Sequence, residues 1–234
     1  MLRQSSYSDQ FTFFQKIRSF DFVLLFCILI LGIISNFSMY STDGGEFLYH
    51  TKSHFIRFII FFTMMIFLSF LSLRFWHSSA YLFYLIVLAF LVWASLYGIT
   101  ASGSQRWINL YFINLQPSEL MKIAIIVCFA RYYHRTQINN IGSFKNIIIS
   151  IMILIIPIVL VVSQPDLGTS ILIGASGIIV LWLAGLNIKY FIYSSLALLI
   201  SLPFVISFLK PYQKLRVLSF FNPDRDPLGA GYQI

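Results

Sequence analysis

Asn146–Ser163 reads NIIISIMILIIPIVLVVS, eighteen consecutive residues without a charged side chain. An α-helix of this length spans about 27 Å, which is close to the ~30 Å hydrocarbon core of a bilayer. Similar apolar runs precede and follow it along the chain. The sequence therefore predicts an all-α fold, a polytopic transmembrane helical bundle of about seven spans. The expected spans are Phe22–Tyr40, Phe55–Leu73, Ala80–Ile99, Ser118–Tyr133, Asn146–Ser163, Gly168–Leu186 and Tyr190–Leu209.

The composition excludes an ordinary water-soluble domain. Hydrophobic residues make up 59% of the 234 residues and charged residues 10%, against roughly 45–50% and 25% in soluble proteins. The mean hydropathy is +0.83. The net charge of +8 comes from Lys and Arg scattered among short connections, without a nucleic-acid-binding pattern. Membrane lipids are the expected partner of these charges, and nucleic acid is not.

Three parts of the chain follow from this pattern: a cytoplasmic N-terminal segment (1–21), the seven-span bundle (22–209), and the start of an extracytoplasmic loop (210–234). With the N-terminus in the cytoplasm, eight of the sixteen Lys and Arg lie inside. Without the residues from Lys210 onward, which begin a longer loop, the count is eight inside and four outside. Because short inner loops are enriched in Lys and Arg, we expect the N-terminus to be cytoplasmic.

The two cysteines, Cys27 and Cys128, each lie inside an apolar run. They offer neither a disulfide framework nor CxxC spacing for a metal. The four histidines lie near span ends, where interfacial placement explains them. The sequence predicts no metal site.

A polar segment, Thr100–Lys122, joins two of the expected spans and is predicted to lie at the membrane surface. Pro117 followed by Glu119 is a helix-start signal. Glu119 and Lys122 are three residues apart and share a helix face. They are interpreted either as a local ion pair or, with Arg106, as a grip on a phosphate-bearing substrate. Lys122 has to reach the interface or find a partner.

A second polar element, Gln164–Thr169, stands between two spans that leave almost no loop between them. Asp166 is interpreted either as the N-cap of the next helix, accepting from Gly168 and Thr169 amides, or as a functional acid. The small residues Gly168, Gly174 and Gly177 predict a face that another helix approaches closely.

Five stretches, in order, resemble the SEDS family, and its RodA branch more closely than FtsW. They are GSQRWI (103–108), QPSELMK (116–122), ARYY (130–133), QPDLGTS (164–170) and PYQKLRVLSFFNPDRDPLGAGYQI (211–234). The resemblance implies a multi-pass protein of the bacterial inner membrane. It implies a peptidoglycan glycosyltransferase that polymerises lipid II in cell-wall elongation and cell-shape maintenance, together with a class B penicillin-binding protein transpeptidase.

The resemblance also implies which side chains bind substrate. Arg106, Glu119 and Lys122 are similar to the family's polar cluster, and Gln164 and Asp166 to its second polar element. The reaction needs a carboxylate base for the attacking sugar hydroxyl and positive charge for the leaving diphosphate. A divalent cation, Arg106 or Lys122 are the candidates for that charge.

The family's catalytic Asp is expected beyond Ile234, so the catalytic residue of this chain is unknown. Asp224 and Asp226 belong to a different motif and do not replace it. On this reasoning the 234-residue chain is expected to be inactive as a polymerase. Two alternatives remain: a transporter or flippase of a lipid-linked precursor, and a non-catalytic scaffold for a transpeptidase.

Overall fold

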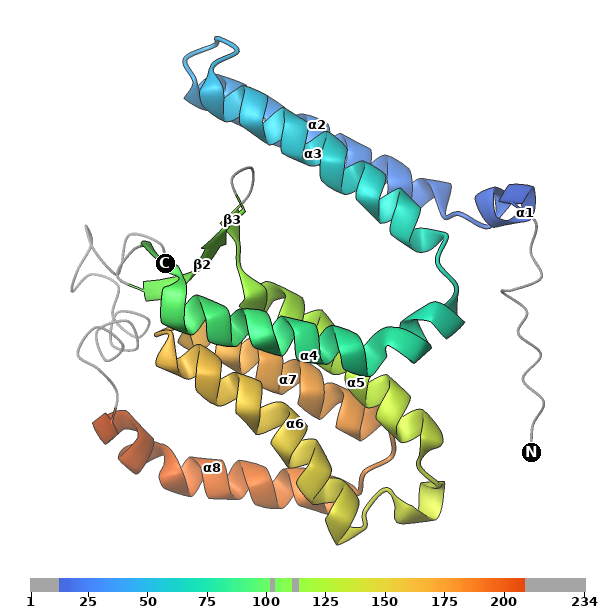
Figure 1. The fold of residues 1–234 in the computed structure, drawn as a ribbon, viewed down its shortest axis with the longest axis vertical. Coiled ribbons are helices and arrows are strands. Elements are labelled where there is room, and N and C mark those ends of the chain that lie inside the picture. Colours follow the sequence, from blue (N-terminus) through green and yellow to red (C-terminus); the bar gives the residue numbers. More distant parts are fainter. Residues whose placement is uncertain (1–12, 102–103, 111–113, 209–234) are drawn as a thin grey trace.

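The computed structural model describes residues 13–101, 104–110 and 114–208. Every predicted span falls on a helix (Figure 1). The predicted segment 210–234 and residues 1–12 lie outside the described residues. The helices are α1 (Phe13–Arg18), α2 (Phe22–Thr42), α3 (Tyr49–Ser69), α4 (Leu73–Tyr97), α5 (Pro117–Arg135), the 3-10 helix η2 (Ile138–Asn140), α6 (Phe144–Ser163), α7 (Leu167–Leu183) and α8 (Ile188–Phe208).

Four of the described helices, α2, α3, α4 and α6, are long and apolar enough to cross a bilayer by their own composition. The other three predicted spans differ for physical reasons. The helix α5 carries charged residues near both ends. The helix α7 has 17 residues and ends shortly before Gly185, whose φ of +96° does not continue a helix. The apolar segment of α8, Ile188–Ser201, is shorter than 18 residues.

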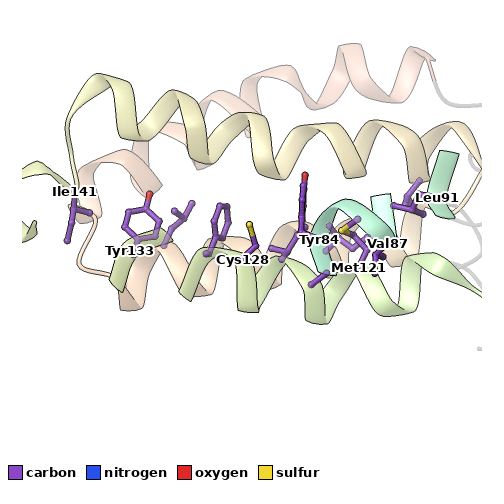
Figure 2. Close-up of a cluster of buried hydrophobic side chains, with 13 residues drawn as sticks. Tyr84, Val87, Leu91, Met121, Cys128, Tyr133 and Ile141 are labelled. Carbon is purple, nitrogen blue, oxygen red and sulfur yellow. The ribbon is translucent and has the colours of Figure 1, made fainter. Parts of the chain in front are cut away.

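The core of the bundle is built around α5, which packs against α4, α6 and α7. Met121, Ala124, Ile125 and Phe129 on α5 are completely buried. Tyr84, Val87 and Leu91 of α4 face them across the same cluster (Figure 2). Cys128 is also buried here, whereas Cys27 on α2 is exposed. The least apolar of the predicted spans is therefore the one that the protein itself surrounds.

The hairpin of α2 and α3 runs apart from this bundle in Figure 1. Its polar side chains pair within the hairpin: His54 contacts Ser35 and Asn36 across the two helices, at 3.1 Å and 3.2 Å. At the turn, Asp43 accepts hydrogen bonds from the hydroxyl and the amide of Thr51, which lower the pKa of Asp43. These bonds satisfy polar groups that lipid would leave unpaired.

The connection between α4 and α5 forms a small antiparallel sheet in the order β1-β2-β3, which the sequence analysis did not predict. Its place at the membrane surface stays a prediction. Its strands are β1 (Ile99–Ala101), β2 (Ser104–Asn109) and β3 (Asn114–Leu115). The strand β2 packs on the ends of α4 and α5. The hairpin thus places β2 over one end of the bundle.

The predicted close-packing face on α7 is confirmed at one glycine and wrong at another. A Cβ at Gly177 would overlap Cδ1 of Leu154 on α6 and lie 3.2 Å from the Phe129 ring of α5. A Cβ at Gly174 would make an ordinary contact with Ile158. At Gly168 a Cβ would meet nothing within 4 Å. Of these three glycines, only Gly177, in the middle of α7, lies where a side chain would not fit.

We expect Gly177→Ala to destabilise the bundle by about 1–3 kcal/mol, because the added methyl overpacks a contact with a fully buried ring. Thermal unfolding of the purified protein in detergent measures this. The matched control is Gly168→Ala, which adds the same methyl to the same helix in open space and is expected to change stability by about 0.5 kcal/mol or less. Equal effects of the two changes would contradict the packing described here.

Candidate functional site

Asp166 lies at the start of α7, where three groups hold its carboxylate. Its Oδ1 accepts from the amide of Thr169 at 3.2 Å, so the predicted N-cap is confirmed for Thr169. Its Oδ2 accepts from Nε2 of Gln116 at 3.0 Å and pairs with Nη1 of Arg106 at 3.2 Å. Asp166 is therefore both the cap of α7 and the acceptor that joins three segments.

Arg106 reaches Asp166 from the sheet. In the pairing of β1 with β2, Ile99 faces Trp107 and Thr100 faces Gln105, so Arg106 is the extra residue of β2 between these pairs. An extra residue of this kind, a β-bulge, bends the strand and redirects a side chain. The Arg106 side chain is 24% exposed and that of Asp166 10% exposed. The ion pair is thus largely sheltered from water, and its attraction is less screened than at a protein surface.

Gln164, the other residue of the second polar element, contacts a different part of the fold from Asp166. The Gln164 side chain is buried, and its Nε2 donates to the carbonyl oxygen of Leu91 on α4 at 2.9 Å. This bond ties the end of α6 to the neighbouring helix. Gln164 therefore stabilises the junction of α6 with α4, because a buried amide without a hydrogen-bond partner would destabilise it.

Glu119 and Lys122 pair with each other on α5, with Nζ and Oε2 2.9 Å apart. This confirms the local ion pair and gives Lys122 the partner that it was expected to need. The Glu119 side chain is 54% exposed and that of Lys122 25%. Among the described contacts, neither Glu119 nor Lys122 touches Arg106 or Asp166. The candidate substrate-binding residues therefore form two separate ion pairs.

Sequence reasoning missed two residues at this end of the bundle. Gln116, just before α5, bonds to Asp166, although the sequence marked it only as part of a motif. Ser118 is 1% exposed, and its hydroxyl has no hydrogen-bond partner among the described residues. The same holds for Nε of Arg106. The sequence signal for Gln116 is its position directly before Pro117, where α5 starts. Its closeness to Asp166 arises only on folding.

The described residues do not supply a divalent-cation site. No three His, Cys, Asp or Glu side chains among them come together as such a site requires. Both carboxylate oxygens of Asp166 already accept from protein donors. Among the described residues, Arg106 and Lys122 carry positive charge at this end of the bundle.

Residues 17–234 match the family model FTSW_RODA_SPOVE, described as "Cell cycle protein". This match covers nearly the whole chain. The chain belongs to the FtsW/RodA/SpoVE family.

Two relatives show how similar the chain is to characterised members. It is 35% identical over 195 residues to the probable peptidoglycan glycosyltransferase FtsW of Buchnera aphidicola subsp. Schizaphis graminum, covering 81% of this chain and 55% of that protein. It is 33% identical over 225 residues to the peptidoglycan glycosyltransferase MrdB of Escherichia coli K12, covering 95% and 60%. The chain thus spans somewhat more than half the length of these relatives.

The solved structures agree with the fold. A chain from a peptidoglycan synthase complex, solved to explain the coordination of polymerization and crosslinking, superposes with a TM-score of 0.78 at 25% identity. The match covers 92% of this chain and 63% of the solved chain. The rod shape determining protein RodA of Thermus thermophilus gives a TM-score of 0.65 at 20% identity, covering 78% and 59%.

These comparisons confirm the predicted family and the polytopic helical fold. Proteins of this family are multi-pass proteins of the bacterial inner membrane, in agreement with the apolar helices. The preference for RodA over FtsW stays a prediction, because the comparisons do not distinguish the two branches.

We expect Arg106 and Asp166 to be coupled by about 1–3 kcal/mol in a double-mutant cycle of Arg106→Gln and Asp166→Asn. Their ion pair is largely sheltered, and removing one partner leaves the other charge without compensation. Denaturant unfolding of the four proteins in detergent measures the coupling.

The same cycle at Glu119 and Lys122 is the control, since that pair is a more exposed contact on one helix. It should yield about 0.2–0.5 kcal/mol. A coupling between Arg106 and Asp166 no larger than this would contradict their role as the central contact of the site.

Proposed function

We propose that this protein is a peptidoglycan glycosyltransferase that polymerises lipid II. The observation that carries the proposal is the family match over residues 17–234. Relatives at 33–35% identity that bear the name of this activity add to it. The N-terminus is proposed to be cytoplasmic, which puts the Asp166 end of the bundle on the extracytoplasmic side, where glycan strands are assembled.

In this proposal Arg106 binds the diphosphate of the substrate. A guanidinium offers a planar set of donors that suits phosphate oxygens. Asp166 occupies Nη1, while Nε has no partner among the described residues. We assign the anion to the guanidinium donors that Asp166 does not occupy. Asp166 and Gln116 act as positioning residues, because they hold Arg106 in the orientation that the β-bulge sets.

The reaction joins two lipid-linked units. The 4-hydroxyl oxygen of one sugar forms a bond to the anomeric carbon of the other, and the bond from that carbon to the undecaprenyl diphosphate breaks. A base takes the hydroxyl proton, and the diphosphate leaves with the bonding electron pair. Asp166 is poorly suited as this base, since both of its oxygens are engaged. Arg106 is placed to stabilise the charge on the leaving diphosphate.

We also propose the elongation branch of the family and a class B penicillin-binding protein as partner. The support is the motif resemblance to RodA. The similar solved chain, from a complex of polymerization and crosslinking, adds to it. Domain boundaries at 21 and 209 belong to the same proposal.

The transport alternative is less well supported by the geometry. A transporter binds its substrate near the membrane midplane, on discontinuous helices. The Arg106–Asp166 pair lies instead at helix ends, on β2 and at the start of α7. The scaffold alternative predicts partner binding without any retention of lipid II.

The decisive test measures lipid II retention by the purified 234-residue chain with native mass spectrometry. We expect retention by the wild type and a loss of about tenfold or more in Arg106→Gln, since a charge-assisted bond to phosphate contributes about 1.5–3 kcal/mol. Arg57→Gln is the matched control, because Arg57 lies on α3 and, within the described part of the chain, donates to a carbonyl of its own helix. A wild type that retains no lipid II would contradict the proposal.

Strand formation is measured on gels in the same preparations, with and without a class B penicillin-binding protein. Strands from this chain would contradict the expected inactivity and would mean that Glu119, Asp166, Asp224 or Asp226 supplies the base. Movement of lipid II across vesicle membranes without any strands would favour the transport alternative.

A further inference from the structure

The end of the bundle opposite to Asp166 gathers basic side chains from two helices. His77 lies near the start of α4, and Arg131, His134 and Arg135 lie in the last turns of α5. The rings of His77 and His134 meet edge to face, with centroids 5.2 Å apart. The charged groups that act on His77 are His134, Arg131 and Arg135, all of them basic. We call these four residues the basic cluster.

Arg131 is held in a defined orientation inside this cluster. Its Nη1 donates to the carbonyl oxygen of Ser78 on α4. Its guanidinium carbon lies 4.4 Å from the centre of the Tyr81 ring, a cation–π contact. Two contacts with α4 therefore fix the guanidinium plane, so that a ligand at this end would meet a preorganised cation.

The protein does not supply the cluster with an anion among the described residues. The described ion pairs, Arg106–Asp166 and Glu119–Lys122, belong to the other end of the bundle. The buried atoms Nε of Arg131 and Nε2 of His77 have no hydrogen-bond partner in the described part of the chain. Two arginines without a carboxylate partner among the described residues, and a buried guanidinium N–H without an acceptor, both point to a missing anionic partner.

The depth of the basic cluster in the membrane indicates which kind of anion binds there. Arg135 is the last residue of α5, and His77 lies one turn inside α4. The cluster is therefore at the level where a spanning helix leaves the hydrocarbon. Tyr81 contacts Arg131, and Trp76 and Tyr132 are the chain neighbours of His77 and Arg131, as expected of aromatic residues at the headgroup level. Phosphate groups of phospholipids lie at this depth.

We infer that the basic cluster is a binding site for the headgroup of an anionic phospholipid, with Arg131 and Arg135 on its phosphate. Leu91 on α4 accepts a hydrogen bond from Gln164, two residues before Asp166, and so marks the Asp166 end of the bundle. His77 is fourteen residues from Leu91 along α4, about 21 Å at 1.5 Å per residue. This lipid site is therefore separate from the Arg106–Asp166 site and independent of the proposed reaction. A lipid here bridges the start of α4 to the end of α5.

The test compares phosphatidylglycerol with phosphatidylcholine on the purified 234-residue chain, by native mass spectrometry. We expect the wild type to retain phosphatidylglycerol preferentially. Removing two charges with Arg131→Gln and Arg135→Gln should lower its affinity by about fivefold for each charge. Arg135→Gln alone is measured as well, because Arg135 is exposed and its loss leaves the Arg131 contacts with α4 in place.

The matched control is Lys145→Gln with Lys189→Gln, which removes two positive charges from the same end of the bundle but outside the cluster. These changes should leave phosphatidylglycerol retention within about twofold of the wild type. An equal loss in both double variants would mean that only the overall charge attracts lipid, and would overturn the inference. Displacement of the lipid by millimolar inorganic phosphate would overturn the assignment to a phospholipid.

Discussion

The structure depends on the burial of one helix, α5, among α4, α6 and α7. One face of its central turns, with Met121, Ile125 and Phe129, is completely enclosed, whereas Ile123 and Ile126 on the other face stay exposed. A bilayer penalises charged groups on a helix that faces the hydrocarbon. Enclosure by neighbours lets α5 keep charged and polar residues at both ends. Each end then becomes a place where other segments converge.

At one end, the start of α5 brings Gln116 next to the start of α7. A single carboxylate, that of Asp166, there accepts from a side-chain amide, a guanidinium and a backbone amide. The three donors come from separate parts of the chain, β2, the residue before α5, and α7 itself. Such a contact orients the arginine more strictly than a surface ion pair, because breaking it also removes a helix cap.

At the other end, the last turns of α5 meet the start of α4, and the balance of charge is different. Arg131 contacts a carbonyl and an aromatic ring instead of a carboxylate. The two ends of the same helix therefore suit different anions. Near Asp166 the arginine charge is partly neutralised within the protein, whereas at the His77 end the cations accumulate. This asymmetry separates a site of proposed chemistry from a site of proposed lipid contact.

The sequence alone determined the helical membrane fold, the approximate span positions, the start of α5 at Pro117 and the capping role of Asp166. These features depend on neighbouring residues, on hydrophobic run length and on the local geometry of a helix end. Only the tertiary structure decided that Arg106 pairs with Asp166, that Gln116 joins them, and that Gln164 bonds to Leu91. The partners are far apart in the chain, and a bulge in a short strand aims the arginine. Local patterns carry no information on such distances, because packing between helices sets them.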